Sequence, residues 1–211
     1  VHAYRDLSSA LGALSAEKSE LWVAGSNVLH ATTATLASTF NSTIRGGFTE
    51  YCDSLEDRED GAISVIDGDN KYAPFAVSVS VGATCFVERM KICRSGTRNI
   101  TKSGSGILSM FRCVISDCAK TEQGVGIYLS GGENLFDACQ FKNLKYSSHE
   151  CAGAALYVTD ANKVSLKNCV FEKNGDFDSH YARDGHGGIA VYSFDAPVIA
   201  DGCKFIGNVE R

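Results

Sequence analysis

Short apolar stretches separated by glycine-containing turns follow one another four times between residues 104 and 208. Each repeat begins with glycine, continues as a strand of alternating apolar and polar residues, and ends with a second strand built around Cys-x-Phe or Cys-x-Ile. Alternation with a period of two predicts strands that bury one face. The repeats are GSGILSMFRCVISDC (104–118), GVGIYLSGGENLFDACQF (124–141), GAALYVTDANKVSLKNCVFEKN (153–174) and GIAVYSFDAPVIADGCKFIGN (188–208).

The repeats align on one cysteine each, and these cysteines recur after 26, 30 and 34 residues. Structural units of a solenoid recur at a comparable interval, about 20 to 50 residues. The additional residues of the longer repeats are polar and lie at 145–151 and 175–186, which predicts loops at one corner of the coil. The pattern therefore predicts an all-β solenoid in which each repeat forms one turn.

Equivalent residues of successive turns should form ladders, because stacked strands lie about 4.8 Å apart. Residues i and i+2 of a strand share a face, so each aligned cysteine faces the same side as the residue two positions later. We expect a buried ladder with reduced thiols, since free cysteine is often buried. The predicted core ladder comprises Cys113, Cys139, Cys169, Cys203, Ile115, Phe141, Phe171 and Phe205. We expect Asn174 and Asn208 to bond to one another and fix a turn.

The first 103 residues are less regular. Apolar residues recur at helical spacing at Leu7, Ala10, Leu11 and Leu14, which predicts an amphipathic helix over residues 6–18. A strand over 20–24 follows, so the helix is placed to cover the apolar end of the coil.

Irregular turns of the same coil are expected over residues 20–103. Residues 27–39 fit either a strand or a loop, and residues 50–61 form an acidic surface excursion. The strands expected here cover residues 42–48 with a Gly-Gly turn at the end, 62–66, 74–81 and 85–93, with a turn at 67–70. We therefore expect one domain over residues 1–211, with regular repeats over 104–208.

The motifs resemble those of a known group of proteins. ELWVAGS, IRGGF, LEDRED and ISVIDGD resemble the N-terminal part of right-handed parallel β-helix surface proteins. The initial glycines and the FxxN sequences at 171–174 and 205–208 resemble the GGAI and FxxN repeats of polymorphic outer-membrane proteins over about the last 105 residues. Residues 141–144 depart from FxxN, and Cys118 replaces another Asn. The resemblance implies a pectin-lyase-like, right-handed parallel β-helix with a short N-terminal capping helix, at the cell surface.

Composition narrows the function. The net charge is −5 and the 20 basic residues are scattered, so a nucleic-acid partner is not expected. With 21 glycines and 2 prolines, the chain suits many strands joined by tight turns. No transmembrane segment is expected, because the uncharged run between Lys71 and Glu88 is short and polar. The chain begins with Val1, which favours a secreted, extracellular or cell-surface protein whose signal peptide has been removed.

The nine cysteines favour an oxidising, extracellular compartment with some disulfides. Cys52, Cys118 and Cys151 lie in loops or at the ends of turns and are the disulfide candidates. The alternative is that free cysteines serve as small core residues. An odd number leaves at least one thiol free or available to another chain.

Gly185-His186-Gly187 resembles the Gly-His-Gly motif of polygalacturonases. Hydrolysis of a glycosidic bond needs one carboxylate to protonate the leaving oxygen and another to activate water. The Asn-Thr-Asp, Asp-Asp and Arg-x-Lys motifs that accompany Gly-His-Gly in those enzymes do not occur in the chain, and no strand face offers a lyase base beside an acidic cluster. We therefore expect no catalytic residue, with a polysaccharide lyase or hydrolase as a second alternative.

Two further motifs have ambiguous chemistry. A mixed set of carboxylates and imidazoles that can bind a divalent metal occurs in the longest loop, at Asp176, Asp178, His180, Asp184 and His186. These residues lack a strict ligand spacing and are more typical of an acidic solvated loop, so no cofactor is expected. Asp67, Asp69 and Asn70 resemble a calcium turn but also suit an ordinary turn. Asn41 and Asn99 begin glycosylation sequons.

Two functions remain after these exclusions. The first is a non-enzymatic extracellular subunit that self-assembles into a sheath, surface layer or filament, with spare cysteines able to link copies. Its expected assembly edge is the last turn, at Phe205, Ile206 and Asn208, three residues before the final Arg211. The helix at the other end opposes simple head-to-tail stacking. The alternative is an adhesin or glycan-binding module that uses the loops at 145–151 and 175–186 with Tyr146, Tyr181 and Tyr192.

Overall fold

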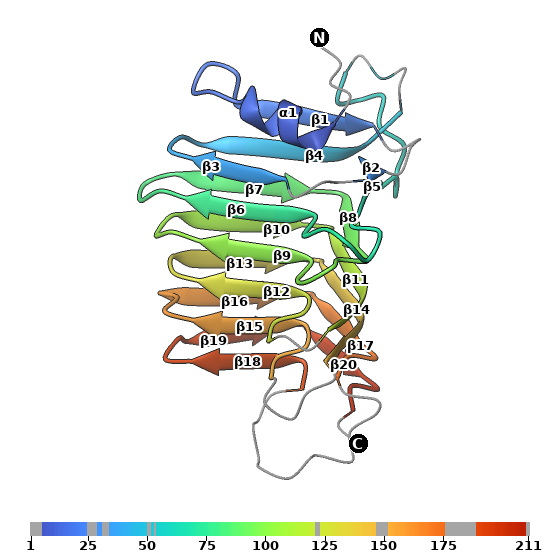
Figure 1. Ribbon diagram of the computed structural model, residues 1–211, viewed down its shortest axis with the longest axis vertical. Helices are drawn as coiled ribbons and strands as arrows, with labels where there is room; N and C mark the ends of the chain where they lie inside the picture. The colour runs from blue at the N-terminus through green and yellow to red at the C-terminus, as the bar shows by residue number, and fades with distance from the viewer. Residues whose placement is uncertain are drawn as a thin grey trace.

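The chain winds into a parallel β-solenoid with three sheets (Figure 1). The computed structural model describes residues 6–24, 29–30, 34–49, 52, 54–120, 123–146, 152–175 and 189–209. Neighbouring strands in every sheet pair in parallel and come from successive turns of the chain. The all-β solenoid expected from the repeats is confirmed.

The three sheets run the length of the molecule side by side. Sheet A consists of β1 (Glu20–Ala24), β4 (Ser42–Phe48), β7 (Thr84–Glu88), β10 (Ile107–Phe111), β13 (Glu133–Asp137), β16 (Lys163–Lys167) and β19 (Val198–Asp201). Sheet B consists of β2 (Leu29–His30), β5 (Ser64–Asp67), β8 (Met90–Cys93), β11 (Val114–Lys120), β14 (Gln140–Tyr146), β17 (Val170–Glu172) and β20 (Lys204–Ile206). Sheet C consists of β3 (Thr35–Ser38), β6 (Phe75–Val79), β9 (Ile100–Ser103), β12 (Ile127–Ser130), β15 (Leu156–Thr159) and β18 (Val191–Phe194).

One helix, α1 (Leu7–Gly12), lies at the N-terminal end of the solenoid beside β1 (Figure 1). The Asp6 side chain accepts a hydrogen bond from the backbone N–H of Ser9, which caps the first turn. Leu7 and Leu11 are buried in the core, so the helix covers apolar residues at this end. It is shorter than the helix expected over residues 6–18, because a turn begins directly after Gly12.

Every second side chain of each strand faces inward, and these side chains fill the interior of the solenoid. Buried residues of one strand lie beside buried residues of the next, and the aromatic column in sheet B is the clearest case. The rings of Phe141 and Phe171 stack 4.6 Å apart with 2° between their planes, and both side chains have no exposed surface. Ile115 pairs with Phe141 in the preceding turn and is likewise buried. Identical residues thus fill identical positions in successive turns, which keeps the packing regular.

A left-handed residue turns the chain from sheet A into sheet B in each of five turns. The residues with positive φ at this corner are Arg89, Arg112, Ala138, Asn168 and Gly202. In the first four of these turns the N–H group of the corner residue continues the hydrogen-bond ladder around the corner, as from Ala138 to the carbonyl oxygen of Lys167 at 2.9 Å. The single strand expected over residues 85–93 is therefore wrong, because Arg89 divides it into β7 and β8.

One further expectation for the first half needs correction. The Gly-Gly pair expected as a turn lies inside β4, where Gly47 has a φ of 82°. A Cβ atom on Gly47 would lie 2.6 Å from the carbonyl oxygen of Ala62, so glycine lets the neighbouring segment approach closely. The turns before residue 104 follow the same order of sheets as the later turns, from β1 onward.

Candidate functional site

The last described turn carries the most exposed apolar surface. It is formed by β18, β19 and β20, at the end of the solenoid opposite α1 (Figure 1). Half of the eight large exposed hydrophobic side chains of the described residues lie in these strands: Phe194 (55% exposed), Ile199 (53%), Phe205 (55%) and Ile206 (49%). We call these four residues the end patch. Phe194, Ile199 and Ile206 take outward positions on sheets C, A and B, whereas Phe205 continues the core column, so the four residues share one turn and not one face. Exposed apolar residues are a feature of interaction surfaces.

Phe205 differs from the other members of its predicted ladder. Its ring stacks on Phe171 at 4.8 Å with 6° between the planes, so it continues the aromatic column. Its opposite face is uncovered because β20 is the last strand of sheet B. The expectation that Phe205 is a core residue is therefore wrong with respect to burial.

Asn208, expected at the same edge, is bonded inward. Its Oδ1 accepts from the backbone N–H of Asn174 at 3.0 Å, and its Nδ2 donates to the carbonyl oxygen of Phe171 at 2.8 Å. Asn174 makes the same two contacts one turn earlier, with Leu144 and Phe141. The two asparagines bond to the backbone of the preceding turn and not side chain to side chain, so Asn208 fixes the turn and leaves the patch to the apolar residues.

The repeated cysteines lie at the corner between sheets A and B and line the core. Cys113, Cys139 and Cys169 have no exposed surface, and Cys203 is half-buried. Each thiol donates to a carbonyl oxygen of the preceding turn, from Cys139 to Met110 at 3.4 Å and equivalently from the others. They therefore act as small core residues that also satisfy backbone acceptors.

The environment keeps two of these thiols, Cys139 and Cys169, protonated. Hydrogen bonding to the thiol of Cys113, together with burial, raises the pKa of Cys139 well above its ordinary value. Hydrogen bonding to Cys139 and burial raise the pKa of Cys169 in the same way. The thiolate is the reactive form of cysteine, so this column has the character of a structural element.

The disulfide candidates Cys52 and Cys118 do not form the expected bonds. Cys52 is a free, half-buried thiol whose Sγ lies 3.2 Å from the Oγ1 of Thr49. Cys118 is buried, and its thiol donates to the carbonyl oxygens of Ser95 and Thr97. Both thiols are thus used in local hydrogen bonds. Cys151, the third candidate, lies outside the described residues.

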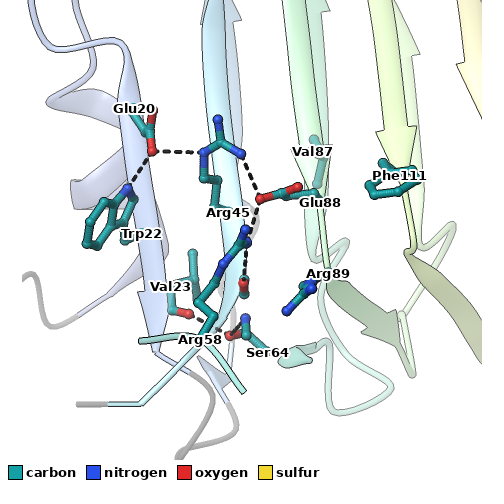
Figure 2. Close-up of polar contacts among 12 residues, drawn as sticks. Glu20, Trp22, Val23, Arg45, Arg58, Ser64, Val87, Glu88, Arg89 and Phe111 are labelled. Atoms are coloured by element: carbon teal, nitrogen blue, oxygen red, sulfur yellow. Dashed lines mark hydrogen bonds and ion pairs between the residues drawn. The ribbon is translucent and has the colours of Figure 1, made fainter. Parts of the chain in front are cut away.

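A charged network joins the first turns on the outer face of sheet A (Figure 2). The Glu88 carboxylate accepts from Nη1 of Arg45 at 2.7 Å and from Nη1 of Arg58, and it is only 6% exposed. Nε of Arg45 also donates to Glu20 at 2.8 Å, and the Trp22 indole N–H donates to the same oxygen. Alternating charges therefore compensate one another across β1, β4 and β7.

The pKa of Glu88 favours the ionised carboxylate, as expected for a partner in ion pairs. Burial raises its pKa, but the hydrogen bonds and charges of Arg45 and Arg58 lower it by more, so the net pKa lies below the ordinary value. A general acid for glycoside hydrolysis needs a raised pKa, which this environment opposes. Arg58 also lies over the ring of Phe48 at 5.1 Å, and so it fixes the acidic excursion to the sheet.

Sequence reasoning missed one buried charge. Lys102 lies in a column of core residues, paired with Leu129 in the next strand, and has no exposed surface. Its Nζ donates to the carbonyl oxygens of Gly104 (2.6 Å), Gly106 (3.0 Å) and Gly131 (2.5 Å). Burial lowers the pKa of Lys102 to about 8. The sequence signal that could have predicted this burial is the position of Lys102 in the strand ITKS, two residues after the apolar Ile100 and therefore on the same face.

The smaller sequence motifs have structural roles where they are described. Asn99 is fully buried, and its Nδ2 donates to the carbonyl oxygen of Ser116, so the folded chain does not offer this sequon for glycosylation. Asn41 is exposed, with its Oδ1 accepting from the N–H of Thr84. Both carboxylate oxygens of Asp67 accept from Arg94, so the 67–70 segment is a turn tied to the next strand.

Several predicted site residues cannot be placed. The possible metal ligands Asp176, Asp178, His180, Asp184 and His186 lie outside the described residues, as do the Gly-His-Gly motif and Tyr181. Within the described ranges, no three or more His, Cys, Asp or Glu side chains gather as a metal site. In the same ranges, no helix combines the length and apolar character needed to cross a membrane.

The solenoid and its stacked ladders define a class of parallel β-helix proteins, and comparison with known families agrees. The family model described as the right-handed β-helix region matches residues 98–211, more than half of the chain. The chain therefore belongs to the right-handed β-helix family, which confirms the resemblance inferred from the repeats. No curated protein and no solved structure matched the chain.

Proposed function

We propose that this protein is a non-enzymatic structural β-helix that self-associates through the end patch. The observation that carries the proposal is the exposure of Phe194, Ile199, Phe205 and Ile206 on the last described turn. The strands of that turn also present a backbone edge, and such edges accept further strands. Apolar burial and strand pairing therefore act on the same turn.

The energetics require both contributions. Each end-patch side chain is about half exposed, so covering it contributes about 1 kcal/mol. Four such contributions are small beside the loss of translational and rotational freedom on association. Backbone pairing along β18, β19 and β20 must supply the rest, so the partner is a strand edge and not a flat apolar surface.

Placement outside the cell is part of the proposal and rests on the resemblance of the repeats to surface proteins. The cysteine content gives it less support than expected, because the buried thiols of the core column need no oxidising compartment. Cys203 is half-buried beside β20, so it is the thiol best placed to link two copies at the end patch. A sheath, surface layer or filament is the kind of assembly that this arrangement suits.

The test is size-exclusion chromatography of the chain over a range of concentrations, with and without reductant. We expect concentration-dependent association that persists in reductant, and loss of association in the Ile199→Lys/Ile206→Lys variant. Leu135→Lys is the matched control, because Leu135 is exposed on sheet A but lies away from the end. The proposal is wrong if the unmodified chain stays monomeric, or if the control loses association equally.

The loop-based adhesin is supported less well. Tyr146 is 4% exposed and cannot act as a surface contact, while Tyr192 lies on the outer face of sheet C beside Tyr157. Among the described residues, no observation favours a lyase or hydrolase. Burial raises the pKa of Glu88, but Arg45 and Arg58 lower it by more, which does not suit a general acid.

A further inference from the structure

The outer face of sheet A alternates in side-chain size from strand to strand. One column of outward residues runs near the middle of the strands from β4 to β19, and none of its side chains is buried. We call it the central column, and it comprises Thr43, Phe86, Ser109, Leu135, Ser165 and Ile199. Large apolar side chains therefore recur at every second strand, about 9.6 Å apart, with a small hydroxyl side chain between them.

A second outward column lies beside the central column and carries charges of both signs. We call it the charged column, and it comprises Arg45, Glu88, Phe111, Asp137, Lys167 and Asp201. Figure 2 shows its beginning, where Nη1 of Arg45 donates to the Glu88 carboxylate. Lys167 and Asp201 are exposed on neighbouring strands at the other end of the sheet. Counted inward from the two ends, the first two residues of the column are opposite in sign.

We propose that two copies of the chain pack sheet A against sheet A about a two-fold axis that runs along the strand direction between β10 and β13. Such an axis keeps the strands of the two copies parallel and reverses the solenoid axis, so β4 of one copy lies over β19 of the other. The facing pairs of the central column are then Thr43 with Ile199, Phe86 with Ser165, and Ser109 with Leu135. Every large side chain meets a small one, which allows the interdigitation that two facing sheets need.

The charges agree with the same arrangement. Arg45 faces Asp201 of the other copy, and Glu88 faces Lys167, so like charges do not meet in the charged column. A two-fold axis along the solenoid would instead place equivalent strands opposite one another, with Leu135 against Leu135. A partner for this face must repeat its size alternation and carry its charges in reverse order. The face itself meets both conditions when it is turned over, which is why the occupant is a second copy.

The size of the face sets the strength of the contact. At about 3.3 Å per residue and about 4.8 Å between strands, six strands of about five residues cover about 17 by 29 Å. Two copies therefore bury about 1,000 Å², which is at the lower limit for specific interfaces. We expect a weak dimer that forms at high concentration.

This contact goes beyond the end-to-end association proposed above and does not depend on it, although Ile199 belongs to both surfaces. Phe194→Lys/Ile206→Lys charges the end patch and leaves every outward residue of sheet A unchanged. This variant, the end-blocked chain, isolates the contact through sheet A. In the otherwise unmodified chain, Leu135→Lys weakens only the contact through sheet A, and association through the end patch persists.

Sedimentation equilibrium of the end-blocked chain measures the dimer. We expect a mass that rises with concentration and stops at two copies, because a two-fold contact closes on itself. Adding Leu135→Lys should raise the dissociation constant about tenfold or more, because each lysine would face Ser109 inside the contact. Val81→Lys is the matched control, since Val81 is 82% exposed and lies outside the strands. A monomer at every concentration up to about 1 mM, or equal effects of both lysines, overturns the dimer and leaves the end patch untouched.

A size exchange tests the facing pair at the centre. Ser109→Leu adds apolar surface, yet it places leucine against Leu135 of the other copy, so we expect weaker dimerisation. Ser109→Leu/Leu135→Ser restores one large and one small residue in each facing pair and should return the dissociation constant to within about threefold of the end-blocked chain. Circular dichroism checks that each variant is folded. Stronger dimerisation with Ser109→Leu alone would show unspecific apolar contact and contradict the proposed register.

Discussion

At the scale of single residues, Ala138 shows that the corner between sheets A and B requires a backbone conformation that is unfavourable for an L-residue. Its φ of 53° is a left-handed conformation, which costs an L-residue roughly 1–2 kcal/mol. Glycine avoids this cost but loses more entropy on folding. We expect Ala138→Gly to raise the free energy of unfolding by about 0.5–1 kcal/mol in a urea titration. Ala76→Gly, inside β6, is the control and should lower the free energy of unfolding. A lower free energy of unfolding in both variants would contradict backbone strain at Ala138.

Lys102 is the residue whose removal should affect the core most specifically. Lys102→Met keeps the length of the side chain but leaves the carbonyl oxygens of Gly104, Gly106 and Gly131 without their donor. A buried acceptor left without a partner costs about 1–3 kcal/mol. We expect the free energy of unfolding at neutral pH to fall by about this amount. An unchanged value would mean that water replaces the ammonium group at no cost.

The pH dependence of stability gives a separate test of Lys102. Burial lowers its pKa to about 8, whereas the unfolded value is about 10.4. Between these values the unfolded chain holds a proton that the folded chain has released, so stability rises with pH. We expect the stability difference between the unmodified chain and Lys102→Met to widen from about pH 8 to about pH 10. Taking the difference cancels the shared titration of cysteines and tyrosines; a constant difference contradicts the lowered pKa.

At the scale of elements, the cysteine column behaves as one unit. Cys113, Cys139 and Cys169 are buried and donate to the preceding turn, while Cys52 and Cys203 are half-buried. We expect iodoacetamide to label Cys52 and Cys203 in the folded protein and to leave the three buried thiols unlabelled until urea is added. Peptide mass spectrometry measures this site by site. Rapid labelling of Cys139 in the folded protein would show that the column opens.

The same elements explain which features sequence could predict. The Cys-x-Phe repeats gave the sheet B register, because stacked turns require equivalent residues at equivalent positions. Asn143, one place early for FxxN, is a left-handed residue that donates to Asp117, and β14 continues past it. Arg89 and Gly47 were misjudged because neighbouring turns, not local propensity, decide their conformations. The inward direction of Lys102 likewise depends on glycine carbonyls from two different turns.

At the scale of the whole molecule, the two ends of the described solenoid differ in chemistry. The leucines of α1 are buried at one end, whereas the last described turn exposes the end patch. Each turn of a solenoid contacts only its neighbours, and among the described residues the last turn has a neighbour on one side only. Sequence pattern predicted the edge at Phe205 and Ile206 but not its extension to Phe194 and Ile199, which requires knowing that all three strands belong to one turn.

Sedimentation velocity over a concentration series tests most directly whether the terminal turn is an association surface. We expect the weight-average sedimentation coefficient to rise with concentration for the unmodified chain, and to stay at the monomer value for Ile199→Lys/Ile206→Lys. The reason is that the lysines charge two of the side chains that association would bury, both about half exposed in the single chain. A sedimentation coefficient that stays at the monomer value for the unmodified chain at every concentration would contradict the account.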